Sequence, residues 1–431
     1  MKKMGIFVLS HCFMLFMAGT VMAADITDPL LKKLMEKGIL TRQDAISIMK
    51  EVEKEKSGEE KKVEEKIERK ITETKPADKD IEGVVKALKG FKLGLLWFLS
   101  YQNGQENNDQ DFSRFVIKRG YLTVQKEFMP WFSARMTTEV TQVKDEAKNA
   151  KGTVFNSYDG SIAVRMKFLY GQFNLPDVAF LTKPLVEVGM VHMPWLDYEE
   201  HINLYRLQDT MFVERNGLFN AADLGVTFAS LLGGTIDEDY QKKVSPYYPG
   251  RYGSTAFGIY NGGGYAASEK NQSKVLEGRL SIRPLPDIIP GLQLTYFGLT
   301  GKGNNDTKPD WKINLGFVSF DHEYFALTGQ YYRGKGNQSG SDENEKKGRS
   351  FFTEIKPMKQ FSVIGRYDYF DPNEDVKNDE NNRYIVGAAY HLDKPYNKFN
   401  NMVLLDYDTV NYKEKGRKND NRVQMTLQVS Y

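Results

Sequence analysis

The closing segment "RVQMTLQVSY" (Arg422 to Tyr431) decides the class of fold, because its polarity alternates at every residue. Val423 and every second residue up to Tyr431 are apolar or aromatic, whereas the residues between them are polar. Successive side chains of a β-strand point to opposite faces. The segment therefore predicts a strand with one apolar face and one wet face.

The same alternation recurs upstream in "WFSARMTTEV", "IAVRMKFLY" and "FSVIGRYDYF". It separates an apolar set from a set that contains Ser, Thr, Arg, Lys, Glu and Asp. The apolar set, which we expect on the outer face, is Phe132, Ala134, Met136, Val140, Ile162, Val164, Met166, Phe168, Phe361, Val363, Tyr367 and Tyr369. Alternation alone also fits a soluble sandwich that has one packed face and one wet face.

Three features favour a membrane barrel over a sandwich. Strand candidates recur roughly every twenty residues, and tight turns such as "KEFMPW" alternate with long polar stretches such as "SDENEKKGR". Aromatic residues gather at strand ends, where an interfacial girdle is expected; examples are Trp97, Phe128, Trp131, Tyr369 and Phe370. A sheet in lipid must close on itself. We predict an all-β, transmembrane antiparallel β-barrel over residues 91–431, with about 16 strands or alternatively 18.

The residues before the barrel predict export and a helical segment. Residues 1–23 combine a basic start, an apolar core and a small residue at the cut, which is typical of a signal peptide cleaved after Ala23. The single cysteine, Cys12, lies inside it. Residues 24–72 predict a periplasmic helical segment, either a coiled coil or a solvated charged helix, and residues 73–90 a linker. An exported barrel is expected in the bacterial outer membrane.

Composition and motifs give no support for an enzyme or a cofactor. The chain holds 59 Lys and Arg against 57 Asp and Glu, so any preference for anions must come from the placement of charges. His192, His201, His322 and His391 occur in no metal-ligand spacing. "NGGGY" reads as a turn, and "DPNEDVKNDENN" reads as a solvated outer loop that departs from a calcium loop.

Basic residues on the face opposite to the apolar set are the candidate pore-lining residues. A cation that faces lipid in mid-membrane costs roughly 2–4 kcal/mol, so these side chains should point into the lumen. They are Arg119, Arg135, Arg165, Lys167, Arg279, Arg283 and Arg366. Two interpretations stay open: the cations bind passing anions, or they pair with inward acids such as Glu139, Glu277 and Asp368. Around Arg119 the outward set is Val116, Leu122 and Val124.

Residues 192–219 interrupt the alternation. This insertion folds inward and narrows the pore, or it covers an outer rim. If it folds inward, Tyr205, Arg206, Glu199 and Glu200 are candidates for the constriction, and Arg215 anchors its return.

Several stretches resemble the phosphate-selective porins of the porin O and porin P type. They include "LLKKLMEKGILTRQDAISIMKE", "FVIKRGYLTVQKEFMPWFSARM" with its pair Lys118 and Arg119, and "FVERNGLFNAADLGVTFAS" with its pair Glu214 and Arg215. The resemblance implies an anion channel, usually a trimer, with contacts to lipid and lipopolysaccharide and no nucleic-acid partner. It also implies that Tyr431 is the signal read by the outer-membrane assembly machinery.

The leading hypothesis is therefore a porin for small hydrophilic, anionic, phosphate-like solutes. An alternative makes the barrel an anchor whose N-terminal helix tethers the outer membrane to the cell wall or to a periplasmic partner. A barrel hydrolase is disfavoured, because no histidine stands beside a serine on an outward face.

Overall fold

A computed structural model describes residues 90–106, 110–148, 154–392 and 401–431. The side chains of residues 144–159 are excluded from this description. The expected signal peptide, helical segment and linker lie outside the described residues. None of the helices in the described part is long and apolar enough to cross a membrane.

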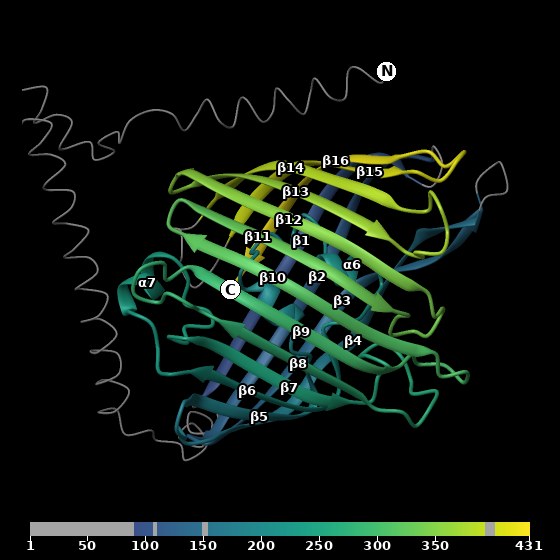
Figure 1. The fold of residues 1–431 in the computed structure, drawn as a ribbon. Helices are drawn as coiled ribbons and strands as arrows, with labels where there is room; N and C mark the ends of the chain where they lie inside the picture. The colour runs from purple at the N-terminus through teal and green to yellow at the C-terminus, as the bar shows by residue number, and fades with distance from the viewer. Residues whose placement is uncertain (1–89, 107–109, 149–153, 393–400) are drawn as a thin grey trace, which may run out of the picture. The chain divides into compact units, whose positions relative to one another are not determined.

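Sixteen antiparallel strands form one closed barrel (Figure 1). The strands are β1 (Phe91–Glu106), β2 (Gln110–Met129), β3 (Phe132–Lys148), β4 (Val154–Asn174), β5 (Leu181–His192), β6 (Ala222–Leu232), β7 (Gly253–Tyr260), β8 (Val275–Ile282), β9 (Leu292–Lys302), β10 (Asp310–His322), β11 (Phe325–Lys335), β12 (Glu345–Met358), β13 (Phe361–Asp371), β14 (Asn381–His391), β15 (Met402–Tyr412) and β16 (Asp420–Ser430). Every strand pairs with its neighbours in sequence. The predicted barrel is confirmed, and the strand count is sixteen.

The first and last strands close the barrel. Pairing of β1 with β16 runs from Leu96 opposite Ser430 to Gln105 opposite Asn421. The amide of Leu95 donates to the carbonyl oxygen of Tyr431 at 3.0 Å, and the amide of Tyr431 donates back at the same distance. No sheet edge is left to face lipid, where an unpaired backbone group has no water to bind.

The two ends of the barrel differ in their connections. At the end that holds the C-terminus, Pro130 and Trp131 alone join β2 to β3, and Glu323 and Tyr324 alone join β10 to β11. An exception is the β6–β7 turn (residues 233–252), which carries α7 (Glu238–Lys243) and projects at the left in Figure 1. Longer loops lie at the other end. Short turns mark the periplasmic end of such barrels.

The outward face is apolar, as the alternation predicts. Met136, Ile162, Val164, Val363 and Met425 are exposed side chains on the outer face, whereas the polar residues between them, such as Thr137, Ser362 and Gln424, are buried inside the barrel. Phe128 and Trp131 are exposed at the turn between β2 and β3, and Trp97 is exposed within β1. The prediction that Phe370 belongs to the aromatic girdle is wrong, because Phe370 is buried and packs against Phe212 inside the barrel.

Two β-bulges shift the alternation and place consecutive side chains in the lumen. The β1–β2 register shifts where Phe98 faces Arg119 and Leu99 faces Ile117, which leaves Lys118 as the extra residue. The β3–β4 register shifts in the same way around Lys167. Phe168, predicted to face outward, is therefore buried inside beside Lys167. Val116, predicted outward, is also buried inside, because it precedes the first bulge.

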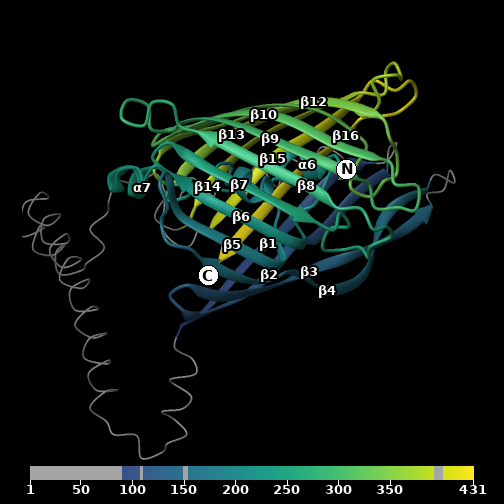
Figure 2. The same ribbon diagram turned by 60° about the horizontal axis from the view of Figure 1, so that its bottom comes forward.

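The connection between β5 and β6 folds into the barrel. These residues (193–221), called here the inward loop, contain α5 (Leu196–Glu200) and α6 (Phe212–Arg215). The strands surround α6 in both views of the ribbon (Figures 1 and 2). Of the two alternatives for residues 192–219, the structure shows inward folding.

Candidate functional site

The inward loop packs on one half of the barrel wall through aromatic side chains. Trp195 and Tyr198 are completely buried. The Trp195 ring lies 5.6 Å from the ring of Phe297 on β9 and 5.3 Å from that of Phe317 on β10. Burying a large apolar side chain stabilises by roughly 1.5–3 kcal/mol. The loop is therefore held against β9 and β10 by packing.

Buried polar groups of the loop find partners on the same half of the wall. The Tyr198 hydroxyl lies 2.7 Å from Ser281 Oγ and 2.9 Å from Thr295 Oγ1. Glu199 accepts hydrogen bonds from Trp195 Nε1 at 2.8 Å and from Gln330 Nε2 at 2.7 Å. Burial raises the pKa of Glu199 to about 7. Glu199 thus supports the loop's fold and faces away from open water.

Tyr205 also contacts this half of the barrel wall. Its hydroxyl donates to Glu354 Oε1 at 2.7 Å, and its ring packs 5.9 Å from that of Phe352. Ser362 Oγ lies 3.1 Å from His391 Nε2 and 2.8 Å from Glu354 Oε1. Ser362 is 1% exposed, so this Ser-His contact is closed to substrates and gives no support for a hydrolase.

Asp209 joins the loop to three basic side chains. Its Oδ2 lies 2.8 Å from Arg383 Nη2 on β14, 3.0 Å from Arg422 Nη2 on β16 and 3.9 Å from Arg215 Nε. Burial favours the neutral acid, but these guanidinium groups hold the pKa of Asp209 well below its usual value. Lys118 adds hydrogen bonds of 2.7 Å to the carbonyl oxygens of Leu207 and Gln208. Asp209 is therefore a charged anchor.

Arg215 anchors the part of the inward loop that leads back to the barrel wall. Its Nη1 donates to Asp368 Oδ2 at 2.6 Å, and Arg366 Nε donates to Asp368 Oδ1 at 2.9 Å. Arg366 is 5% exposed. The two predicted cations Arg215 and Arg366 thus meet on one carboxylate.

The β6–β7 turn contacts the loop from the periplasmic side. The Tyr248 hydroxyl donates to Asp197 Oδ2, and the Tyr247 ring lies 4.2 Å from the ring of His201. His201 Nδ1 lies 3.5 Å from Asp197 Oδ2. Burial disfavours the charged imidazole, but Asp197 outweighs it and raises the pKa of His201 to about 9. Asp197 and His201 therefore form an ion pair at neutral pH.

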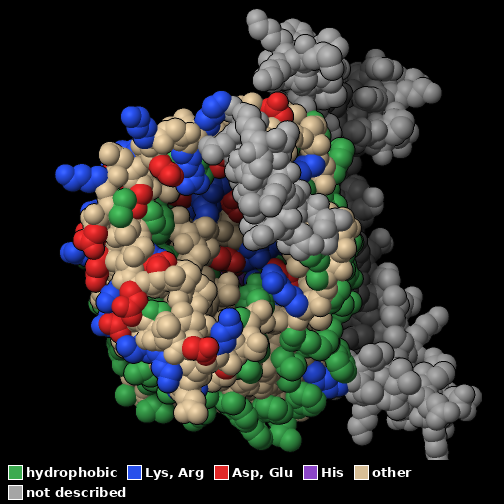
Figure 3. Space-filling view, turned by 90° about the vertical axis from the view of Figure 1, so that its right-hand side faces the viewer, with side chains coloured by type: hydrophobic (Ala, Val, Ile, Leu, Met, Phe, Trp, Pro, Cys, Tyr) green, Lys and Arg blue, Asp and Glu red, His purple; other side chains and the backbone are tan. Residues whose placement is uncertain are grey.

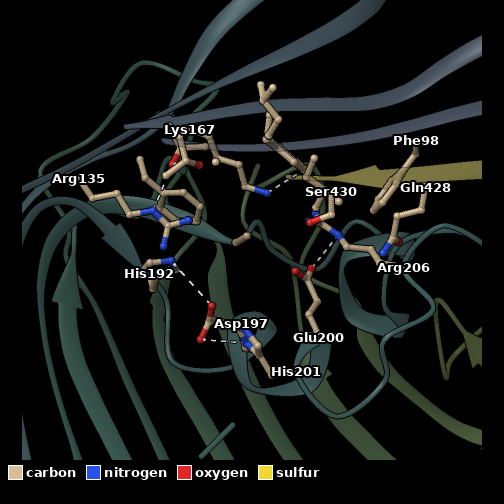
Figure 4. A pocket seen from close by; sticks show the side chains of 18 of the residues that line it. Phe98, Arg135, Lys167, His192, Asp197, Glu200, His201, Arg206, Gln428 and Ser430 are labelled. Carbon is tan, nitrogen blue, oxygen red and sulfur yellow. Dashed lines mark hydrogen bonds and ion pairs between the residues drawn. The ribbon is translucent and has the colours of Figure 1, made fainter. Parts of the chain in front are cut away.

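A cavity of about 380 Å³ remains between the loop and the opposite wall. Arg135 on β3 and Lys167 on β4 line it from the wall, and Asp197, Glu200 and Arg206 line it from the loop. Figure 4 shows these two groups of side chains facing each other. At the loop end of the barrel, blue Lys and Arg side chains are visible within the hollow (Figure 3). The cavity is the candidate constriction.

The charged side chains of the loop form an ion pair in this cavity, whereas the two cations of the wall have hydroxyl groups as hydrogen-bond partners. Arg206 Nε lies 2.9 Å from Glu200 Oε1. Among the described residues neither Arg135 nor Lys167 forms a salt bridge. Arg135 Nε donates to Thr137 Oγ1 at 3.2 Å, and Lys167 Nζ donates to Tyr121 Oη at 3.1 Å. Lys167 is 2% exposed and lies close enough to Glu139, Glu200 and Glu214 to interact with their carboxylates. Arg135 is half-buried, so it is the wall cation that a solute can meet.

Arg119 and Arg165 share the carboxylate of Glu139. Arg119 Nη1 lies 2.9 Å from Oε1 and Arg165 Nε lies 2.6 Å from Oε2. Arg119 also reaches Glu214 at 3.2 Å. The Arg165 side chain keeps 40% of its surface exposed, whereas Glu139 keeps 1%. Arg165 can therefore meet solutes in the lumen although it is paired.

Of the remaining predicted cations, Arg279 supports the inward loop and Arg283 supports the turn between β8 and β9. Arg279 is 3% exposed, and it donates at 2.9 Å to the carbonyl oxygen of Pro194 and to Ser254 Oγ. Arg283 is also buried and donates to the carbonyl oxygen of Pro290. Glu139 and Asp368 form ion pairs with inward cations, which agrees with the interpretation that inward acids pair with these cations. Within the described residues Glu277 has no hydrogen-bond partner for either carboxylate oxygen.

Comparison with known proteins identifies the fold. No family model matches the chain, and no curated protein matches it. Among solved structures, OmpF of Salmonella typhi in complex with daunomycin is 10% identical, with a TM-score of 0.51 over 79% of this chain and 97% of that chain. The anion-selective porin from Comamonas acidovorans is 10% identical, with a TM-score of 0.50 over 79% and 99%. A loop L8 deletion mutant of OmpT, an outer membrane protein of Vibrio cholerae, is 9% identical, with a TM-score of 0.50 over 79% and 99%.

The chain has the fold of a bacterial outer-membrane porin. At these identities the likeness concerns the fold, and the resemblance to phosphate-selective porins stays a prediction.

Sequence reasoning missed several residues of this porin-fold site. Asp209, Arg383 and Arg422 form the charged anchor, and Tyr247 and Tyr248 contact the loop from a turn far along the chain. Arg422 begins the alternating segment and lies on its inward face. The alternation could therefore have identified Arg422 as a residue of the lumen. The two tyrosines carry no local signal. Within the described residues, no group of three or more His, Cys, Asp and Glu could hold a metal.

Proposed function

We propose that this protein is a bacterial outer-membrane channel for the passive diffusion of small hydrophilic solutes, with a preference for anions. The observation that carries the proposal is Arg135, which lines the constriction, is half-buried and forms no salt bridge with the described residues. A barrel of sixteen strands leaves room for an aqueous path. The porin fold supports the outer-membrane location.

The sign of the preference follows from the charges that line the cavity. Asp197 is neutralised by His201, and Glu200 by Arg206. Arg135 then supplies the positive charge that a solute meets, and a confined charge of one sign enriches the opposite ion. A chloride or phosphate ion is therefore favoured over a cation of equal size at this position.

Reversal potentials in planar bilayers under a salt gradient test this proposal. We expect anion selectivity in the native protein. The substitution Arg135→Gln removes this positive charge, so it should lower the anion-to-cation permeability ratio, roughly fivefold at low salt. Lys167→Gln should have a smaller effect, because Lys167 is 2% exposed.

Arg417→Gln is the matched control. Arg417 is exposed in the β15–β16 loop and pairs with Glu414 at 3.4 Å, away from the cavity. It should leave the ratio unchanged. A native channel that selects cations, or a double variant of Arg135 and Lys167 with unchanged selectivity, would overturn the anion preference. A protein that conducts no ions would overturn the channel itself.

Phosphate-like solutes are the finer form of the proposal. Guanidinium and ammonium groups donate several charge-assisted hydrogen bonds, which suit a phosphate oxygen. Addition of phosphate to a chloride-conducting channel should then reduce the chloride current. An unchanged current would restrict the channel to general anion diffusion. The homotrimer implied by the family resemblance is tested by the mass of the detergent-solubilised protein.

A further inference from the structure

A loop at the outer end of the barrel reaches across part of the lumen to another section of the wall. Residues 261–274 connect β7 to β8, and Tyr265 in this loop donates a hydrogen bond to Glu139 Oε2 on β3 at 3.2 Å. The strands β4, β5 and β6 lie between β3 and β7 in the barrel, so this contact crosses the lumen instead of following the wall. Because Glu139 lies near the middle of β3, the Tyr265 side chain extends well into the barrel.

Two basic side chains of β4 lie beside the Tyr265 ring. The guanidinium carbon of Arg165 lies 5.0 Å from the ring centre, and Lys167 Nζ lies 5.8 Å from it. A cation over an aromatic face is attracted by the ring. Arg165 Nε also donates at 2.6 Å to Glu139 Oε2, the oxygen that accepts the hydrogen bond from Tyr265. The wall therefore holds Tyr265 both at its ring face and at its hydroxyl group.

Glycines before Tyr265 allow the loop to follow this path. They form the stretch "NGGGY" (Asn261 to Tyr265). Gly264 has a φ of +75°, a conformation that favours glycine. A β-carbon on Gly264 would lie 2.8 Å from Asn220 Nδ2 of the inward loop. The absence of side chains therefore lets the β7–β8 loop lie directly against the inward loop, while Tyr265 points to β3 and β4.

The β7–β8 loop is anchored on both sides of Tyr265. Before it, the amide of Gly262 donates to Asp223 Oδ2 on β6 at 2.6 Å. After it, Asn304 Oδ1 from the β9–β10 connection accepts from the amide of Lys270 at 2.8 Å, and Asn304 Nδ2 donates to the carbonyl oxygen of Ser268 at 2.9 Å. Asn304 is 5% exposed. These buried contacts hold the loop in the position from which Tyr265 enters the lumen.

Tyr265 stands between the outer solvent and the candidate constriction. The cavity is lined by Gly94, Ser430 and Tyr431, which lie toward the periplasmic ends of β1 and β16. Lys167 lines the same cavity and lies beside the Tyr265 ring. The other half of the lumen is occupied by the inward loop, which packs on β9 and β10. A solute that enters from the loop end therefore meets Tyr265 before it reaches the constriction.

We propose that Tyr265 is an outer filter of the channel and determines which sizes of solute enter from the outer side. Its ring narrows the passage between the β7–β8 loop and the wall of β3 and β4, and the constriction below it then selects by charge. The diameter of a pore and the groups that line it set its selectivity. The inference rests on the proposed channel function, but it concerns size and is independent of the charge preference.

Exclusion of neutral polymers in planar bilayers tests this filter. A polyethylene glycol that enters a channel lowers its conductance, whereas one that is too large to enter leaves the conductance unchanged. Tyr265→Ala removes the ring, so larger polymers should enter from the chamber that faces the loops, and the single-channel conductance should rise roughly twofold. The size limit measured from the opposite chamber should stay as in the native protein, because the inward loop is unchanged.

Tyr412→Ala is the matched control. Tyr412 lies at the loop end of β15, where its hydroxyl donates to Asp420 Oδ2 at 2.8 Å and the Arg417 guanidinium carbon lies 3.5 Å from its ring centre. Tyr412 thus makes the same two kinds of contact as Tyr265, but within one hairpin. Its substitution should leave both size limits unchanged. Tyr265→Phe keeps the ring in the passage and should also keep the native size limits.

An unchanged size limit from the loop side in Tyr265→Ala would overturn the inference. An equal rise from both chambers would also overturn it, since the change would then lie at the inward loop, as would a size limit in Tyr265→Phe as large as that in Tyr265→Ala, since the ring would then not be the barrier. Failure of the filter with anion selectivity preserved overturns this inference alone, whereas a native protein that conducts no ions overturns the proposed function. Heat-modified mobility in gels verifies that each variant keeps the barrel.

Discussion

The two halves of the lumen contain the same types of basic residue, but these residues have different roles. On β3 and β4, Arg135 and Lys167 line the cavity, and Arg165 keeps 40% of its side-chain surface exposed although it pairs with Glu139. On β8 to β14, Arg279, Arg366 and Arg383 lie under the inward loop and are matched by carboxylates or carbonyl oxygens. The loop creates this difference, because it covers one wall and leaves the other open. Inward orientation alone therefore does not make an arginine part of the pore.

The largest effect is expected where the loop is anchored by charge. Asp209→Ala removes a carboxylate that Arg383 and Arg422 share, although both keep Asp408 as a partner. Each hydrogen bond to a charged group that is lost costs roughly 1.5–3 kcal/mol. We expect a lower free energy of unfolding in urea and a larger, noisier single-channel conductance, because the covered wall becomes open.

Asp239→Ala is the control for this change. Asp239 is an exposed residue of α7 that lies 3.8 Å from Lys243, and exposed pairs contribute roughly 0–1 kcal/mol. A quiet, native-like conductance in Asp209→Ala would show that packing of Trp195 and Tyr198 holds the loop by itself.

A matched pair of substitutions on the two walls should give opposite phenotypes. Arg279→Gln removes two buried hydrogen bonds and should lower the free energy of unfolding by about 3 kcal/mol, with little change in selectivity. Arg135→Gln should lower anion selectivity with a smaller change in stability. Urea titration and reversal potentials on both variants measure the comparison. A selectivity change in Arg279→Gln that equals the change in Arg135→Gln would remove the distinction between the walls.

The smallest effect concerns pH. His201 has a raised pKa of about 9 in the folded protein, so its pair with Asp197 is fully present below the usual histidine pKa of about 6.5. That stabilisation is lost as the pH rises through about 9. We expect protease cleavage within the inward loop to increase over this window. His201→Gln should make cleavage independent of pH there, and a native protein with a flat profile would contradict the pairing.

The sequence predicted the barrel and most inward faces, because period-two alternation survives wherever the strand register is regular. It failed at Phe168 and Val116, which lie beside bulges that add one residue to a single strand. A bulge depends on pairing between two strands, so it has no signature in either strand alone.

The candidate site was predictable in part. Arg135, Lys167, Glu200 and Arg206 line the cavity, and residues 192–219 were recognised as an insertion. Which cations keep a free charge depends on contacts that are distant in sequence, such as Arg383 with Asp209. Periodicity gives the direction of a side chain, whereas its partner is set by the path of the inward loop.

The inward loop also has a mechanical consequence. Its residues are hydrogen-bonded or ion-paired to β2, β8, β9, β11, β12, β13, β14 and β16. A closed sheet without internal supports flattens easily under lateral pressure from the surrounding membrane. Flattening of this barrel would have to stretch contacts between the loop and several strands at the same time. The inward loop therefore makes the cross-section of the barrel stiffer.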